Sequence, residues 1–92
     1  MKVRFSPNFY RQYKKADVRI QNSIDEKLRI FRKNPIDLEL KNHTLQEPYQ
    51  DRRSIDITND YRAHYREIKE GMETVAYFVS LGTHEELYRK SN

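Results

Sequence analysis

The N-terminal segment has the pattern of a short strand followed at once by a helix. Residues 2–5 alternate polar and apolar, which is typical of a strand with one buried face. Ser6 is a favourable N-cap residue, and proline suits the next position because its missing N–H would have no helical partner anyway. We therefore expect a helix from Pro7 to about Ala16, with Phe5 packed on Tyr10 at its first turn.

A second helix is predicted by an apolar stripe at helical spacing. Asp17 can cap its start and Asn34-Pro35 ends it. Asp25 and Arg29 are four residues apart and are expected to pair on its outer face. That pair would contribute only ~0.3 to 0.5 kcal/mol, so packing of the stripe should hold the helix. The stripe consists of Ile20, Ile24, Leu28 and Phe31.

The second half of the chain alternates with the period of two that marks strands. Residues 53–57, 61–66 and 73–79 show this pattern, and the last is the most apolar and is therefore expected to be central. The polar segment 35–51 is expected to be a loop with a short strand at 43–45.

Turn signals at Asn59-Asp60 and Glu70-Gly71 separate these strands, and short turns imply antiparallel neighbours. The sequence therefore predicts an α+β fold. One small domain spans residues 1–92, with an N-terminal strand and two helices packed on one face of an antiparallel β-sheet.

Composition narrows the function classes. The absence of cysteine excludes disulfides, thiolate chemistry and cysteine-based zinc sites. Without an apolar run of 18 residues or a signal peptide, we expect a soluble, cytoplasmic protein. The net charge of +4 is uneven, because residues 1–41 hold 11 basic and 5 acidic side chains and residues 42–92 hold 7 and 9. A basic half can bind a polyanion, or it can be a solvated helical face.

Alternation in the strand 61–66 assigns its side chains to two faces. The tyrosines at 61 and 65 belong to the core, which leaves Arg62, His64 and Arg66 in a row on the open face. Their spacing of about 7 Å is close to that of successive phosphates on a nucleic-acid strand. The alternative is a solvated face whose arginines pair with Glu67, Asp56 or water.

A further motif follows the most apolar strand. Gly82 can take the positive φ of a sharp turn, and Thr83 can cap a one-turn helix with Glu86 as its capping-box partner. This helix would bring His84 and Tyr88 to the same side. Both residues could equally serve packing.

Three segments together resemble bacterial toxins of the RelE/ParE superfamily, most closely the YafQ branch. They are KNHTL at 41–45, NDYRAHYR at 59–66 and GTHEELY at 82–88, and with the order of elements the similarity covers nearly the whole chain. The resemblance implies a microbial RNase-type fold and a toxin that cleaves messenger RNA on the ribosome. It also implies a cognate antitoxin that holds the toxin inactive.

The resemblance also implies site residues. His84 matches the terminal histidine of YafQ-like toxins, where RelE has an arginine, and Tyr88 matches an active-site aromatic residue. His43 matches a histidine at the head of the sheet, Asp60 an acid, and Arg62 a phosphate-contacting arginine of RelE.

The sequence also departs from the YafQ pattern. YafQ carries a further histidine where this chain offers only Ser54, Asp56 or Thr58, and a tryptophan where Tyr61 stands. His64 has no counterpart.

Cleavage of RNA by its own 2′-OH needs one proton acceptor and one proton donor. We assign His84 as general acid and His43, aided by Asp60, as general base, with the reverse assignment open. Arg62, assisted by Arg66 or Arg53, would stabilise the phosphorane. The residues expected to bind RNA are Tyr88, by stacking on a base, and Arg66, His64, Arg53 and Lys41.

We expect no metal and no other cofactor, because the histidines lie on separate strands with no short-range pair. The expected partners are the antitoxin, messenger RNA in the ribosomal A site, and ribosomal RNA, with no membrane. Ribosomal RNA would contact the basic N-terminal half through Arg11, Lys14, Lys15, Arg29 and Lys33. The alternatives are a ParE-like inhibitor of DNA gyrase with the same fold and no nuclease activity, and a basic module that binds structured RNA without turnover.

Overall fold

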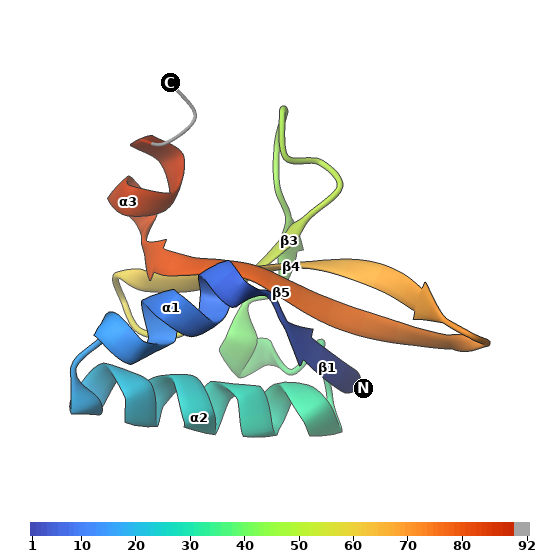
Figure 1. The fold of residues 1–92 in the computed structure, drawn as a ribbon, viewed down its shortest axis with the longest axis horizontal. Coiled ribbons are helices and arrows are strands. Elements are labelled where there is room, and N and C mark those ends of the chain that lie inside the picture. The colour runs from blue at the N-terminus through green and yellow to red at the C-terminus, as the bar shows by residue number, and fades with distance from the viewer. Residues whose placement is uncertain (90–92) are drawn as a thin grey trace.

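The computed structural model describes residues 1–89. Figure 1 shows a sheet across the middle of the molecule, with the long second helix on one side and the last helix on the other. In chain order the elements are β1 (Lys2–Phe5), α1 (Pro7–Lys15), α2 (Val18–Lys33), the 3-10 helix η1 (Leu38–Leu40), β2 (His43–Thr44), β3 (Arg53–Asp56), β4 (Tyr61–Glu70), β5 (Glu73–Thr83) and α3 (His84–Arg89). The α+β fold with an N-terminal strand is confirmed.

The sheet has the strand order β1-β5-β4-β3-β2. β5 has neighbours on both sides, as its apolar sequence predicted, and the strands from β2 to β5 are antiparallel. β1 is the exception, because it pairs with β5 in parallel and makes the sheet mixed. The β4–β5 hairpin is longer than the alternation predicted, since cross-strand pairing continues to the turn at Gly71, where φ is +62°.

The caps of the first two helices are those that the sequence predicted. The Ser6 side chain accepts from the Phe9 N–H at 3.0 Å, and the Asp17 carboxylate accepts from the Ile20 N–H at 3.0 Å. The expected packing of Phe5 on Tyr10 is wrong. The Phe5 ring stacks on Phe9 instead, with ring centroids 5.1 Å apart. Phe9 is buried and Tyr10 is exposed, so Phe5, itself 39% exposed, covers the buried Phe9 ring from the surface.

The stripe on α2 forms the centre of the core. Ile24, Leu28 and Phe31 are buried under the sheet, and Ile20 is partly buried at one end. The predicted ion pair between Asp25 and Arg29 is wrong: Asp25 accepts from the Tyr13 hydroxyl at 2.9 Å and Arg29 pairs with Glu26. Packing of the stripe therefore holds this helix.

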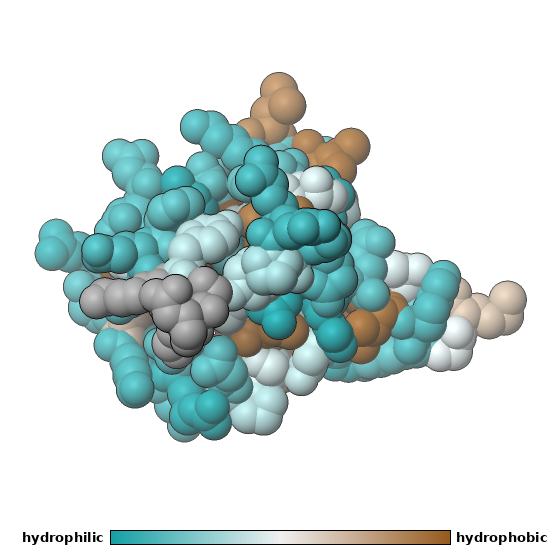
Figure 2. Space-filling model, turned by 90° about the horizontal axis from the view of Figure 1, so that it is seen from above, coloured by the Kyte–Doolittle hydropathy of each residue, from teal (hydrophilic) through white to brown (hydrophobic). Residues whose placement is uncertain are grey.

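Two segments stand on the face of the sheet opposite α2. They are α3 and the β2–β3 connection, residues 45–52, which rise side by side in Figure 1. Viewed from that side, the surface is predominantly hydrophilic (Figure 2). We call this surface the open face. Within residues 1–89, no helix has the length and apolar composition needed to cross a membrane.

Candidate active site

Strand register lines up a row of polar side chains across the open face. His43 on β2 pairs with Ser54 on β3, Ser54 pairs with His64 on β4, and His64 pairs with Ser80 on β5. Paired residues point to the same face, so all four side chains lie in one row. The next pair is Tyr65 with Phe78, so Val79 is left unpaired at a β-bulge. The Val79 carbonyl accepts hydrogen bonds from the side chains of Ser6 and Asn8, at the start of α1.

A capping box fixes the start of α3. The Thr83 N–H donates to Glu86 Oε1 at 2.9 Å, and the Glu86 N–H donates to Thr83 Oγ1 at 3.1 Å, as the sequence predicted. The positive φ expected at Gly82 is absent; a Cβ there would lie 3.0 Å from Glu86 Oε1, so glycine leaves room for the box. Because α3 begins here, the His84 N–H can donate to the Asp60 carbonyl at 3.1 Å.

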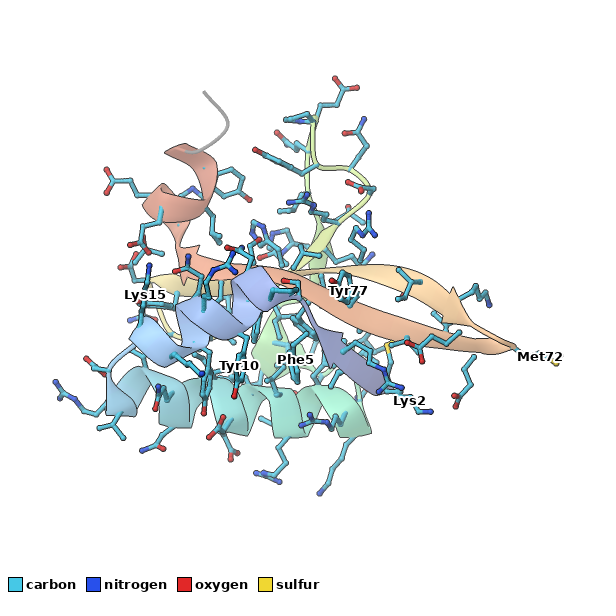
Figure 3. All side chains as sticks on the ribbon, viewed as in Figure 1. Lys2, Phe5, Tyr10, Lys15, Met72 and Tyr77 are labelled. Carbon is cyan, nitrogen blue, oxygen red and sulfur yellow. The ribbon has the colours of Figure 1, made fainter. Side chains whose placement is uncertain are left out.

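His84 and Tyr88 lie on the same side of α3, with ring centroids 4.6 Å apart. The helix has six residues rather than the expected single turn, so Tyr88 is held within it. Tyr88 also meets the Tyr49 ring of the 45–52 loop edge-on at 6.3 Å. Side chains of the loop and of α3 extend toward one another above the sheet (Figure 3).

A cavity of about 340 Å³ collects residues from four separate segments. We call it the histidine cavity; its lining includes Lys41, His43, Ser54, Asp56, Arg62, His84 and Tyr88. His43 on β2 and His84 at the start of α3 are both exposed here. The structure thus brings together both histidines, the arginine and the aromatic residue that the sequence singled out, although they are far apart along the chain.

The His43 ring is oriented by a backbone carbonyl. Its Nδ1 lies 2.8 Å from the Lys41 oxygen, in a segment where Lys41 itself has a φ of +49°. A carbonyl oxygen only accepts, so Nδ1 carries the hydrogen in this contact. The neutral ring therefore presents the lone pair of Nε2, the arrangement that a general base requires.

Arg62 is held in place by acceptors from the β3–β4 turn. Its Nη1 donates to the carbonyls of Thr58, Asn59 and Tyr61 at 2.9 to 3.1 Å. Its Nε lies 3.0 Å from Asp56 Oδ1, and both side chains are only about one-fifth exposed. The guanidinium is therefore fixed, with Nη2 directed at no acceptor among the described residues.

The acid in the histidine cavity is Asp56, not Asp60 as the resemblance implied. Asp60 is exposed in the turn and contributes its carbonyl to His84, while its carboxylate does not line the cavity. Asp56 is one of the three residues, with Ser54 and Thr58, that this chain offers in place of the further histidine of the YafQ pattern. Its pairing with Arg62 is the observation that selects it.

His64 differs most from its expected place. It is 3% exposed, although the alternation placed it in an open row of cations. Tyr88 covers it, with centroids 5.8 Å apart. Burial, followed by the positive charge of Arg52, lowers the pKa of His64 to about 4, so the imidazole is neutral near pH 7.

This burial predicts a pH-dependent stability. The unfolded chain binds a proton on His64 near its usual pKa of 6.5, whereas the folded protein binds it only near 4. The free energy of unfolding should therefore fall as the pH drops from about 6.5 to 4, by up to about 3 kcal/mol. Urea unfolding at several pH values measures this, and the His64→Phe variant should lose much of the dependence. An equal slope in both proteins would show that another group is responsible.

The remaining predicted RNA contacts divide between the two faces. Lys41 lines the histidine cavity. Arg66 is on the open face but its Nη1 lies 4.0 Å from Asp51. Arg53 pairs with Tyr65 across the strands and lies on the core face of the sheet. Its Nε donates to Asn42 Oδ1 at 2.7 Å, so Arg53 cannot assist Arg62. Within the described part of the chain, no three His, Asp or Glu side chains are grouped so that they could hold a metal ion.

No protein-family model and no curated protein matches the sequence. The structure, in contrast, is similar to solved toxins. YafQ from Escherichia coli matches with a TM-score of 0.76 at 21% identity, over 95% of this chain and 97% of that one. A YoeB/ParE toxin from Agrobacterium tumefaciens matches with a TM-score of 0.73 at 22% identity, over 91% and 99%.

A third match is the toxin-antitoxin complex RelBE2 from Mycobacterium tuberculosis, with a TM-score of 0.64 at 21% identity, over 90% of this chain and 96% of that one. Each of these comparisons spans nearly the whole of both chains, so the similarity concerns the complete domain. The chain therefore has the fold of the RelE/YafQ-like toxin superfamily.

Proposed function

We propose that this protein is the toxin of a type II toxin-antitoxin system and an endoribonuclease that cleaves messenger RNA on the ribosome without a metal. One observation carries the proposal: two exposed histidines and one fixed arginine, from separate elements, meet at a single cavity. Such a group is what phosphodiester cleavage by proton transfer requires. The similarity to YafQ and to RelBE2 supports the same reaction class.

The proposed reaction uses the ribose 2′-OH as the nucleophile. His43 Nε2 takes the hydroxyl proton while the 2′-oxygen bonds to phosphorus, and the bond to the 5′-oxygen breaks as His84 donates its proton to that oxygen. The products are a 2′,3′-cyclic phosphate and a 5′-hydroxyl. Arg62 Nη2 stabilises the charge on the phosphorane, and because its other nitrogens are bound already, little reorganisation is needed.

We assign Asp56 to position Arg62 in this reaction. Asp56→Asn removes the charge that holds Nε, so we expect a loss of cleavage of ~10²-fold. Asp60→Asn should change the rate by less than about threefold, because its carboxylate lies outside the cavity. Single-turnover cleavage of ribosome-bound message by the two variants measures the difference. A larger loss of cleavage in Asp60→Asn than in Asp56→Asn would assign the carboxylate of the site to Asp60 instead.

The proposed partners are the programmed ribosome and a cognate antitoxin. RelBE2, one of the structural matches, is described as a toxin-antitoxin complex.

The test is cleavage of a defined message on purified ribosomes, mapped by primer extension. Each reaction is run with and without EDTA, and enough magnesium is present in both to keep the ribosomes intact. We expect cuts within the A-site codon in wild type, also after the protein has been stripped of metal by prior dialysis. An intact message would reject the nuclease, and inhibition of gyrase supercoiling would then support the ParE-like alternative. Binding of message without cleavage would support the RNA-binding module.

A further inference from the structure

A second cavity lies on the open face, beside the histidine cavity. It has a volume of about 370 Å³, and its walls come from α1, β4, β5, α3 and the 45–52 loop. The residues that matter here are Gln12, Tyr49, Arg52, His64, Ser80 and Glu86. We call it the Arg52 cavity. His64 and Ser80 continue the polar row that begins at His43 and Ser54 in the histidine cavity.

Two buried nitrogens in this cavity lack partners. Among the described residues, Arg52 Nε and His64 Nε2 are the buried side-chain polar atoms with no hydrogen bond, and both residues line this cavity. Buried polar atoms are nearly always paired, because an unpaired one has lost its hydrogen bonds to water and gained none in return. Two such atoms, both on residues that line one cavity, favour a group there that accepts hydrogen bonds.

The charge of Arg52 indicates which group. The arginines Arg4, Arg29, Arg62 and Arg66 each pair with a carboxylate. Arg52 is partly buried and lies over the Tyr49 ring, 5.3 Å from its centroid, and none of the ion pairs among the described residues includes it. A guanidinium held partly out of water without an anion is unfavourable. An anion with several acceptor oxygens would satisfy Arg52 and, in the tautomer that carries its hydrogen on Nε2, His64.

The walls of the cavity are compatible with an anion. Glu86 is the acidic residue among its lining residues, and its Oε1 is engaged by the Thr83 N–H in the capping box. The backbone of Arg52 is fixed, because its N–H donates to the Tyr49 carbonyl and its carbonyl accepts from Leu45. The guanidinium is therefore presented by a rigid turn rather than by a freely moving chain.

We propose that the Arg52 cavity binds a phosphate group of the RNA substrate, one that neighbours the phosphate being cleaved. This inference rests on the proposed function and adds a subsite to it. The two cavities lie next to each other, since His64 in one is the strand neighbour of Ser54 in the other. Neighbouring strands are about 5 Å apart, so an RNA strand that crosses the row reaches both cavities within a few nucleotides.

The first experiment measures anion binding separately from cleavage. Nuclear magnetic resonance follows the His64 ring while inorganic phosphate, or a short 2′-deoxy oligonucleotide that cannot be cleaved, is added. We expect the His64 signals to shift, and Arg52→Gln to weaken oligonucleotide binding about tenfold or more. Arg19→Gln, an exposed arginine on α2, is the matched control and should bind as wild type does.

The second experiment separates binding from chemistry. Arg52→Gln should raise KM for message cleavage about tenfold while kcat stays within about threefold, and Arg52→Lys should restore part of the loss because it keeps the charge. Spectral dispersion reports whether each variant is folded; if Arg52→Gln is not, Arg52→Lys and His64→Gln supply the comparison.

The outcomes distinguish this inference from the proposed function. Oligonucleotide binding that depends on Arg52, with no cleavage by wild type, supports the cavity and rejects the nuclease. If cleavage and oligonucleotide binding are both unchanged in Arg52→Gln, the phosphate subsite is rejected and the proposed nuclease activity is not. The two nitrogens would then be bound to water. Phosphate binding alone, with no oligonucleotide binding at His64, also overturns the proposal.

Discussion

His84→Ala should lower RNA cleavage by ~10²- to 10⁴-fold and leave the fold unchanged. The imidazole is exposed, and its ring contact is with Tyr88 at 4.6 Å, so little packing is lost. Alanine keeps the backbone N–H that donates to the Asp60 carbonyl, and it keeps the capping box that starts α3. Single-turnover cleavage of ribosome-bound message measures the rate, and urea unfolding measures the stability.

Two comparisons make this result specific. Arg19→Gln, on the opposite side of the sheet, should cleave at the wild-type rate. If His84 donates the proton, a substrate with a better 5′ leaving group should recover most of the lost rate in His84→Ala but not in His43→Ala. Activity of His84→Ala within about threefold of wild type would remove His84 from the chemistry.

Phe31→Ala should cost about 3–5 kcal/mol of stability, the largest effect that we expect for one substitution in the core. The ring is fully buried, and it meets Tyr65 and Phe78 edge-on at 5.0 and 5.2 Å, so it joins α2 to the two long strands. A domain of this length has a free energy of unfolding of roughly 5–14 kcal/mol, so the variant should be close to unfolding.

The shift in the urea midpoint at pH 7 measures this cost. Leu38→Ala is the control, because Leu38 is 91% exposed and should change stability by no more than about 0.5 kcal/mol. If Phe31→Ala lowers the free energy of unfolding by less than about 1 kcal/mol, Phe31 does not pack between α2 and the sheet as described. Cleavage activity should fall with the folded fraction, since Phe31 lies on the face away from both cavities.

The local features of the fold were readable in the sequence because neighbouring residues determine them. Ser6 and Asp17 cap helices through N–H groups three residues away, and Thr83 and Glu86 bind each other's N–H groups across a single turn. The stripe on α2 follows from helical periodicity alone. Such features need no knowledge of where the rest of the chain lies.

The place of the acid depended on strand register. A two-residue turn at Asn59-Asp60 would set Asp56 opposite Ala63, on the core face. The connection in the structure is longer, so Asp56 pairs with Arg62 and shares its face. One residue of register therefore decides which carboxylate enters the site, and short turn signals do not fix register to one residue.

By itself, the sequence determined the α+β fold, the caps, the buried stripe and the face that carries Arg62, because each depends on residues within a few positions or on a regular period. Only the tertiary structure decided that His64 is buried and neutral and that the Arg52 Nε is buried without a hydrogen bond to the described residues. The reason is physical: burial and charge pairing at these positions are set by α3 and the 45–52 loop, which reach them from distant parts of the chain.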